Sequence, residues 1–151
     1  MANNPPLPNL SKTLQVGIVA GFIATSVGNF LGIVTQSIAG QYYPETSVGA
    51  VTLSAMSMAI VGAIVYYLLY QQAGRFARDI FTMMGLTVPT VITLFVLSGF
   101  YDAAFRVIAV SVAYAVSMSV VIIVPWLADK YKILERPSHS SHSKNRKHGR
   151  S

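Results

Sequence analysis

The amino-acid sequence predicts an all-α polytopic membrane protein, an antiparallel bundle of four transmembrane helices with both termini in the cytoplasm. Three observations lead to this prediction. Hydrophobic residues make up 53% of the 151 residues and charged residues only 11%, whereas charged residues are about a quarter of an ordinary soluble domain. Four long intervals carry no charge at all. Almost every Lys and Arg then falls on one side of the topology that these intervals define.

The charge-free intervals mark the expected spans, because a charge at the bilayer centre costs about 2.5 kcal/mol or more and a span needs about 20 apolar residues. Each interval is long enough to cross the membrane once. Together they predict a transmembrane domain over residues 13–128, with helices at about 14–38, 48–70, 80–98 and 107–127. The connections are short, so consecutive helices are expected to be antiparallel neighbours.

The first expected helix carries two GxxxG motifs, formed by Gly17 with Gly21 and by Gly28 with Gly32. In lipid, helices associate through the close approach of small residues, because apolar burial gives no advantage there. The second and fourth helices offer small residues at four-residue spacing: Ala55, Ala59 and Ala63, and Ser111, Ala115 and Ser119. We expect these positions to pack the helices of one chain together, with a homodimer contact as the alternative.

The third expected helix contains Gly85 and Pro89. A proline inside a helix removes one backbone hydrogen bond and clashes with the preceding turn, so a kink near the membrane midplane is expected. Thr90 and Thr93 are expected to bond to the carbonyl groups that the proline leaves free.

Several polar side chains fall near the middle of the expected spans. Asn29 is the costliest of them, because an unpaired amide in hydrocarbon carries a penalty of several kcal/mol. We expect it to face the bundle interior and to bond to a hydroxyl or to a carbonyl at the kink. Two interpretations stay open for the group, which are hydrogen bonding between helices and the lining of a small polar cavity. Its members are Asn29, Ser57, Thr90, Tyr114 and Ser117.

The distribution of basic residues predicts the orientation, since cytoplasmic flanks retain positive charge. With four spans, the N-terminal segment 1–12, the middle connection and the C-terminal tail share one side, which carries ten of the eleven Lys and Arg residues. The opposite side carries only Arg106. Both termini are therefore expected in the cytoplasm of a bacterial cell, with the helices in its inner membrane.

Residues 129–151 are basic and lack apolar periodicity, so they are expected to form a disordered cytoplasmic tail. Attraction to the anionic inner leaflet is the expected role, at about 1 kcal/mol for each basic residue near the surface. The residues concerned are Lys130, Lys132, Arg136, Lys144, Arg146, Lys147 and Arg150. Loose metal binding by His139, His142 and His148 is an alternative. Nucleic-acid binding is disfavoured, because no aromatic residue follows Tyr131 to stack on a base.

The sequence excludes several kinds of chemistry. It contains no cysteine, which rules out disulfides and thiol nucleophiles. The cores of the expected spans contain no acidic, basic or histidine residue, which disfavours proton-coupled transport. We expect no catalytic residue, metal or cofactor. The expected function is that of a non-enzymatic accessory or assembly component of the membrane, possible partners being a second copy or another membrane protein. A small-molecule carrier or channel subunit is the alternative.

The overall pattern resembles a known kind of protein. A glycine-rich first helix with a central Asn29, a short cytoplasmic connection containing arginine, and a last helix ending Val-Val-Ile-Ile-Val-Pro-Trp-Leu are its main features. Over residues 12–128, these features resemble small bacterial four-helix membrane proteins classed as domains of unknown function. Members of such families often carry a histidine within the last helix, which this sequence lacks. The resemblance implies a fold and a membrane location but no activity.

Overall fold

The computed structural model describes residues 10–130, and residues 1–9 and 131–151 lie outside the described part. Between residues 10 and 130 the chain is helical without any strand, which confirms the all-α prediction. Two short 3-10 turns, Pro44–Thr46 and Gly74–Phe76, lie in the first two connections. The α-helices are α1 (Leu10–Ala39), α2 (Val48–Ala73), α3 (Ala77–Ser98) and α4 (Ala103–Lys130).

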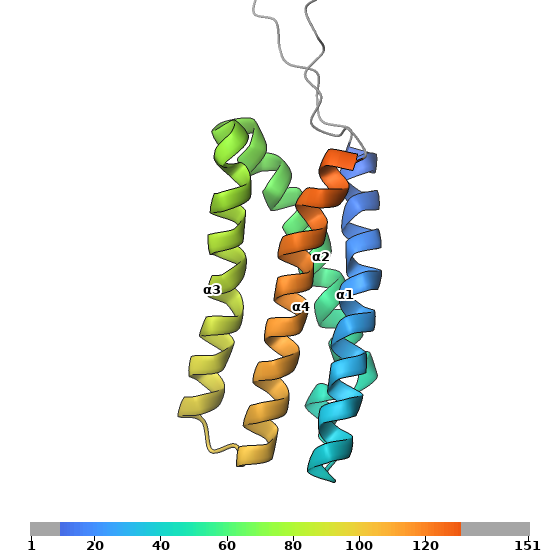
Figure 1. The fold of residues 1–151 in the computed structure, drawn as a ribbon, viewed down its shortest axis with the longest axis vertical. Helices are drawn as coiled ribbons and strands as arrows, with labels where there is room; N and C mark the ends of the chain where they lie inside the picture. The colour runs from blue at the N-terminus through green and yellow to red at the C-terminus, as the bar shows by residue number, and fades with distance from the viewer. Residues whose placement is uncertain (1–9, 131–151) are drawn as a thin grey trace, which may run out of the picture.

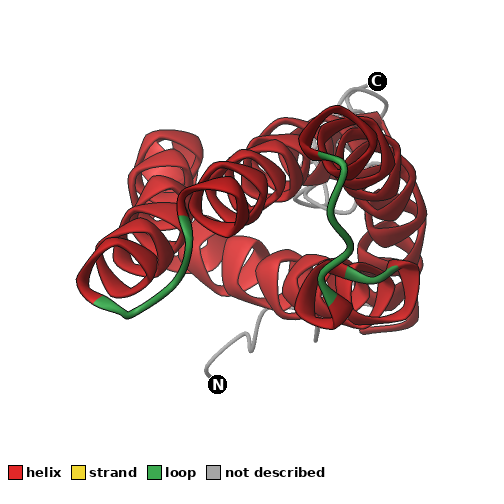
Figure 2. Cartoon of the chain, turned by 90° about the horizontal axis from the view of Figure 1, so that it is seen from below, coloured by secondary structure: helices red, strands yellow, loops and turns green. Residues whose placement is uncertain are grey.

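The helices run along the long axis of the molecule (Figure 1). The start of α1, the turn between α2 and α3 and the end of α4 lie at one end, which we call the basic end after Lys12, Arg75, Arg78 and Lys130. The α1–α2 and α3–α4 connections lie at the other end of the molecule, which we call the opposite end. Figure 2 shows these two connections as loops in a view along the helices.

Three helical stretches are long and apolar enough to cross a membrane: Ser11–Ala39, Val48–Ser98 and Ala103–Lys130. The middle stretch has 51 residues and includes both α2 and α3. The 30 residues of α1 span about 45 Å at 1.5 Å per residue, more than the roughly 30 Å thickness of a bilayer's hydrocarbon core. The prediction of helices long and apolar enough to span a membrane is confirmed.

Local capping chemistry determines where the helices end. The Oγ atom of Ser47 accepts a hydrogen bond from the backbone N–H of Ala50 and caps the start of α2. Gly74 follows the end of α2 with φ of 56°, a conformation that glycine adopts without steric cost. Asp102 caps α4, which therefore begins at Ala103, earlier than the charge-free interval predicted.

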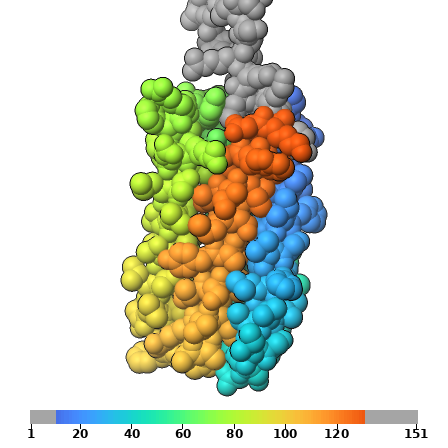
Figure 3. All heavy atoms as spheres, in the orientation of Figure 1, coloured from blue at the N-terminus to red at the C-terminus, as the bar shows by residue number. Residues whose placement is uncertain are grey.

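One apolar core joins the helices. α1 packs chiefly against α2 and α4, and α3 packs against α4 and α2. On the face seen in Figure 3, α4 fills the space between α1 and α3. The largest side chains in this core that are completely buried come mainly from α4, and they are Val16, Ile108, Val120 and Val124. Helix α4 is thus the central element against which the others are placed.

Candidate functional site

The backbones of α1 and α2 approach each other closely at the first GxxxG motif. A Cβ atom added to Gly17 would lie 2.8 Å from the Cα of Ile60. The same atom on Gly21 would lie 2.7 Å from the Sδ of Met56. The first GxxxG motif therefore lets the two backbones come together, as small residues do between membrane helices. The facing residues of α2 are buried, and they are Ala55, Ala59 and Ala63.

The second GxxxG motif contacts both α2 and α4. A Cβ atom on Gly28 would lie 2.6 Å from Val116 Cγ2 and 2.9 Å from Val51 Cγ1. On Gly32 it would meet Val112 Cγ2 at 3.6 Å, which is an ordinary van der Waals distance. The four glycines of α1 thus lie at its packed side. A Cβ atom would meet backbone at Gly17 and branched side chains at Gly28, whereas at Gly21 it would meet the flexible side chain of Met56 and at Gly32 it fits.

The face of α4 that packs against the other helices is not the face that its small residues predicted. Ser111, Ala115 and Ser119 are only half-buried, and Ser119 Oγ donates to the carbonyl oxygen of Ala115 at 2.7 Å, within its own helix. Branched side chains fill the grooves that the glycines of the neighbouring helices open. The buried branched residues of α4 are Ile108, Val112, Val116, Val120, Val121 and Val124.

Helix α3 is held to α4 by a hydrogen bond at the proline. Pro89 has no N–H, so the carbonyl of Gly85, one turn earlier, has no helical donor. Ser117, which is completely buried, donates its hydroxyl to this carbonyl at 2.5 Å. A Cβ atom on Gly85 would lie 2.1 Å from Val121 Cγ2, so the two helices are in contact here. A buried serine of one helix thus satisfies the group that proline exposes in the other.

The two threonines near Pro89 do not bond to that carbonyl. Thr90 Oγ1 donates to the carbonyl of Leu86 at 2.8 Å, and Thr93 Oγ1 donates to that of Pro89 at 2.7 Å. These are ordinary bonds to the preceding turn, where threonine in a helix commonly places its hydroxyl. The expectation for Thr90 and Thr93 was therefore wrong, because a side chain reaches its own preceding turn and not the carbonyl of Gly85.

The mid-depth polar residues do not form one cluster. Asn29 Nδ2 donates to Thr52 Oγ1 at 3.1 Å between α1 and α2. The hydroxyls of Thr90 and Tyr114 lie 3.4 Å apart between α3 and α4. Ser57 is exposed on α2 and joins neither pair. The structure thus supports separate hydrogen bonds between helices rather than a shared lining.

Two contacting residues gave no clear signal in the sequence. Thr52 is the partner of Asn29, but a threonine in an apolar helix has no distinguishing pattern. Gly62 lies in α2 next to the buried Ala63. A Cβ atom on Gly62 would lie 3.1 Å from Val120 Cγ1 and 3.5 Å from Phe81 Cζ. A lone glycine without a second one four residues away is not recognisable as a packing position.

At the opposite end, Tyr43 and Asp102 connect two loops that are far apart in sequence. The Tyr43 hydroxyl donates to Asp102, with Oδ2 at 2.7 Å, and its ring packs edge-on against Phe105 with 5.2 Å between centroids. Asp102 Oδ1 also accepts from the backbone N–H of Phe105 at 2.7 Å. We call the Tyr43–Asp102 hydrogen bond the loop contact, because it ties the α1–α2 connection to the α3–α4 connection.

The loop contact changes the acidity of both groups. The N–H of Phe105 and the Tyr43 hydroxyl lower the pKa of Asp102, because both stabilise the carboxylate. Desolvation and the Asp102 carboxylate raise the pKa of Tyr43, because both disfavour the phenolate. The folded state is therefore favoured by an ionised aspartate and a neutral tyrosine.

These shifts predict a pH dependence at both extremes. The stability that Asp102 supplies is present above its ordinary pKa of about 4 and is lost as pH falls through its lower folded value. The stability from Tyr43 is present below about pH 10 and is lost as pH rises through its higher folded value. When thermal unfolding is measured across pH, Asp102→Asn should remove this loss of stability at acid pH. Tyr43→Phe should remove the loss of stability at alkaline pH. Unchanged acid behaviour in Asp102→Asn would contradict this assignment.

Arg106 donates hydrogen bonds to carbonyl groups at and beyond the end of α3. Its Nε donates to the carbonyl of Tyr101 at 2.9 Å, and its Nη2 donates to that of Gly99 at 3.1 Å. Carbonyl groups at and beyond a helix C-terminus lack intrahelical donors, so a guanidinium is a suitable partner for them. Arg106 is thus part of the loop structure at this end.

An open recess of about 220 Å³ lies at the opposite end, between the last part of α1 and the start of α2. We call it the polar recess. Gln36 shapes it, because Nε2 donates to the carbonyl of Thr46 at 3.0 Å and Oε1 accepts from the N–H of Tyr43 at 3.5 Å. The lining residues are Asn29, Ile33, Gln36, Ser37, Tyr42, Thr46, Ser47 and Val48.

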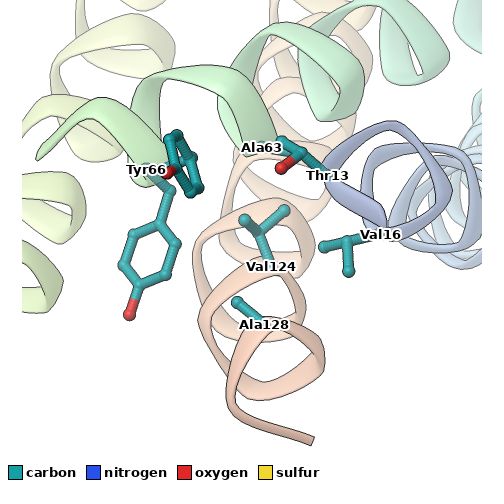
Figure 4. A pocket seen from close by; sticks show the side chains of 7 residues that line it. Thr13, Val16, Ala63, Tyr66, Val124 and Ala128 are labelled. Atoms are coloured by element: carbon teal, nitrogen blue, oxygen red, sulfur yellow. The ribbon is translucent and has the colours of Figure 1, made fainter. Parts of the chain in front are cut away.

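A second cavity lies among α1, α2 and α4 at the basic end, and Figure 4 shows Thr13, Ala63 and Val124 beside it. Its volume is about 10 Å³, which is roughly the space that one water molecule needs. Thr13 is 4% exposed, and its Oγ1 has no partner among the described residues. The cavity can hold one water molecule but no larger ligand.

The basic end carries exposed cations beside aromatic rings. The Lys130 Nζ lies 5.0 Å from the ring centroid of Trp126, and the Arg75 guanidinium carbon lies 5.2 Å from that of Phe76. Tryptophan is typical of membrane interfaces. The remaining basic residues expected to contact lipid lie outside the described residues: Lys132, Arg136, Lys144, Arg146, Lys147 and Arg150.

Across residues 10–130, no group of three or more His, Cys, Asp or Glu side chains could hold a metal ion. The described contacts hold helices together, join two loops and leave one polar recess. No protein-family model, curated protein or solved structure matches the chain.

Proposed function

We propose that the chain is a non-enzymatic accessory component of the bacterial inner membrane, with four transmembrane spans and both termini in the cytoplasm. The observation that carries the proposal is the gathering of exposed cations at one end. Lys12, Arg75, Arg78 and Lys130 come from three separate chain segments that meet there, whereas Arg106 lies alone at the opposite end. Positive charge concentrated at one end of a set of membrane helices marks the cytoplasmic side.

The division of the long middle stretch supports the count of four spans. Its 51 residues are interrupted by the 3-10 turn Gly74–Phe76, beside which α2 ends and α3 begins. Each of these two helices exceeds the approximately 20 residues that a span needs, with 26 residues in α2 and 22 in α3. The turn contains Arg75 and precedes Arg78, which supports its place at the cytoplasmic surface.

The close glycine contacts support a role as a rigid membrane component. Gly17 and Gly85 lie where an added Cβ atom would meet Ile60 and Val121 at less than van der Waals distance. Such packing gives each helix one position relative to its neighbours. A fixed core of this kind presents its basic end and the attached tail to the anionic leaflet, which supports an anchoring or assembly role.

Cysteine labelling tests the orientation, because the chain has no native cysteine. Glu45→Cys lies at the opposite end and Gln72→Cys at the basic end, and both native side chains are exposed. In intact cells, a membrane-impermeant maleimide should label Glu45→Cys and should label Gln72→Cys only after the membrane is permeabilised. Labelling of Gln72→Cys in intact cells would overturn the proposed orientation.

A fluorophore in the tail tests the proposed lipid partner. In full-length protein reconstituted in nanodiscs, an environment-sensitive dye on Asn145→Cys should shift its emission to the blue in phosphatidylglycerol but not in phosphatidylcholine. Added salt should reverse the shift, because the attraction is electrostatic and screened over about 10 Å at 0.1 M. The same dye on Glu45→Cys serves as the control. An equal shift in both lipids would argue against recognition by charge.

A further inference from the structure

The polar recess extends from the opposite end toward the middle of the membrane. Ser37 lies near its mouth and Asn29 at its deep end, about 12 Å apart along α1 at 1.5 Å per residue. Ile33 and Val48, which also line it, are each 55% exposed, so the recess opens to the side of the molecule. In the proposed orientation, an occupant would enter from the outer membrane interface.

The accessible surface of the recess is mainly apolar, and the polar groups that interrupt it carry no charge. None of its eight side chains is acidic or basic, so the recess offers no counter-ion for a phosphate, a carboxylate or an ammonium group. It offers both donors and acceptors instead. The Ser47 Oγ accepts from Ala50, which leaves its proton free, and the Ser37 hydroxyl donates to the carbonyl of Ile33, which leaves its lone pairs free.

Asn29 has unused hydrogen-bonding capacity at the deep end. The Thr52 hydroxyl donates its single proton to the carbonyl of Val48 at 2.6 Å, so it can only accept from Asn29. This fixes Nδ2 toward Thr52 with one N–H left over. The Oδ1 of Asn29 is buried without a partner among the described residues, so the remaining N–H of Nδ2 is the group that Asn29 offers to an occupant.

The volume limits the size of the occupant. About 220 Å³ corresponds to roughly seven water molecules at about 30 Å³ each, and it is below the approximately 300 Å³ at which sites for drug-sized molecules begin. A group of a few carbon atoms with several hydroxyls fits both this volume and the neutral mixture of donors and acceptors.

We propose that the polar recess binds an uncharged polyhydroxyl group, either the sugar headgroup of a neutral lipid or a free polyol. Hydroxyl groups both donate and accept, so they match Ser37, Ser47, Tyr42 and the Asn29 amide together. The site is independent of the accessory role proposed above, because its lining residues take no part in the basic end.

Side-chain amide NMR signals of the full-length protein test this binding. The protein is labelled with nitrogen-15 in Asn and Gln and held in phosphatidylcholine nanodiscs, and the probes are monoglucosyl diacylglycerol in the bilayer and free glycerol in solution. The Asn29 and Gln36 signals should shift saturably, whereas those of Gln71 and Gln72, near the basic end, should not. A response to the glycolipid alone identifies a lipid site, and a response to glycerol as well identifies a site open to solvent.

A matched pair of variants separates binding in the recess from a general effect. Ser37 and Ser26 are both exposed on α1, and each donates to the carbonyl four residues earlier, at 2.8 and 2.9 Å. Only Ser37 lines the recess. Ser37→Leu should abolish the shifts, and Ser26→Leu should retain them. Absence of a saturable shift with both probes in the unaltered protein, or equal shifts in both variants, would overturn the proposal.

Discussion

Replacing Gly17 with alanine is expected to destabilise the protein by about 1–3 kcal/mol, the usual cost of overpacking. The added Cβ atom would lie 2.8 Å from the Cα of Ile60, so no side-chain rotation can relieve the clash. Helices α1 and α2 must separate instead. The loss should exceed the gain of about 1 kcal/mol in helix propensity that alanine has over glycine. Unfolding of the full-length protein in mixed micelles, followed by circular dichroism, measures the difference.

Gly32→Ala is the matched control in the same helix. Its Cβ atom would meet Val112 at 3.6 Å, an ordinary contact, so the substitution should be neutral or should stabilise by up to about 1 kcal/mol. Gly17 and Gly32 both belong to GxxxG motifs, but Gly17 faces the backbone of Ile60 and Gly32 faces the side chain of Val112. Equal destabilisation by both substitutions would mean that the contact between α1 and α2 at Gly17 is not what limits stability.

The GxxxG motifs of α1 could be recognised in the sequence because they depend on local spacing. A four-residue repeat places Gly17 and Gly21 on one face of any helix, whatever its neighbours are. Which glycine meets backbone at short distance and which meets a side chain at an ordinary distance depends on where two helices cross. For this reason the sequence could not distinguish Gly17 from Gly32.

The sequence could not predict the rotation of α4 about its axis, which decides which of its faces is buried. In lipid both small and branched faces are apolar, so hydropathy does not say which one turns inward. The serine and alanine pattern of Ser111, Ala115 and Ser119 suggested one face, and the structure buries the neighbouring valines. The glycines of α1 and α3 provide the physical reason, because each leaves a groove that a branched side chain fills.

The same lack of rotational information explains the mid-depth polar residues. Depth can be counted from the span ends, so the sequence correctly places Asn29 and Ser117 well inside their helices. The hydrogen-bond partner of each residue depends on which helix faces lie against each other. Ser57 faces outward, Asn29 bonds to Thr52, and the hydroxyl of Ser117 reaches a carbonyl that only Pro89 makes available.

Ser117→Ala is expected to cost about 1–2 kcal/mol, because it leaves the carbonyl of Gly85 without a donor in a completely buried site. Ser119→Ala is the control in the same helix. Its hydroxyl donates to the carbonyl of Ala115, which lies within α4 and keeps its helical partner. The control should therefore change the free energy of unfolding by only a few tenths of a kcal/mol.

A double-mutant cycle with Pro89→Ala separates the hydrogen bond from packing. Alanine at position 89 restores an N–H that can donate to the carbonyl of Gly85 within α3, so that carbonyl no longer needs Ser117. In the Pro89→Ala background, Ser117→Ala should then cost about 0.5 kcal/mol or less, which gives a coupling energy of about 1 kcal/mol. If Ser117→Ala costs the same in both backgrounds, the serine stabilises the interface through its shape alone. The coupling would then be zero, and the carbonyl that proline exposes would play no part in joining α3 to α4.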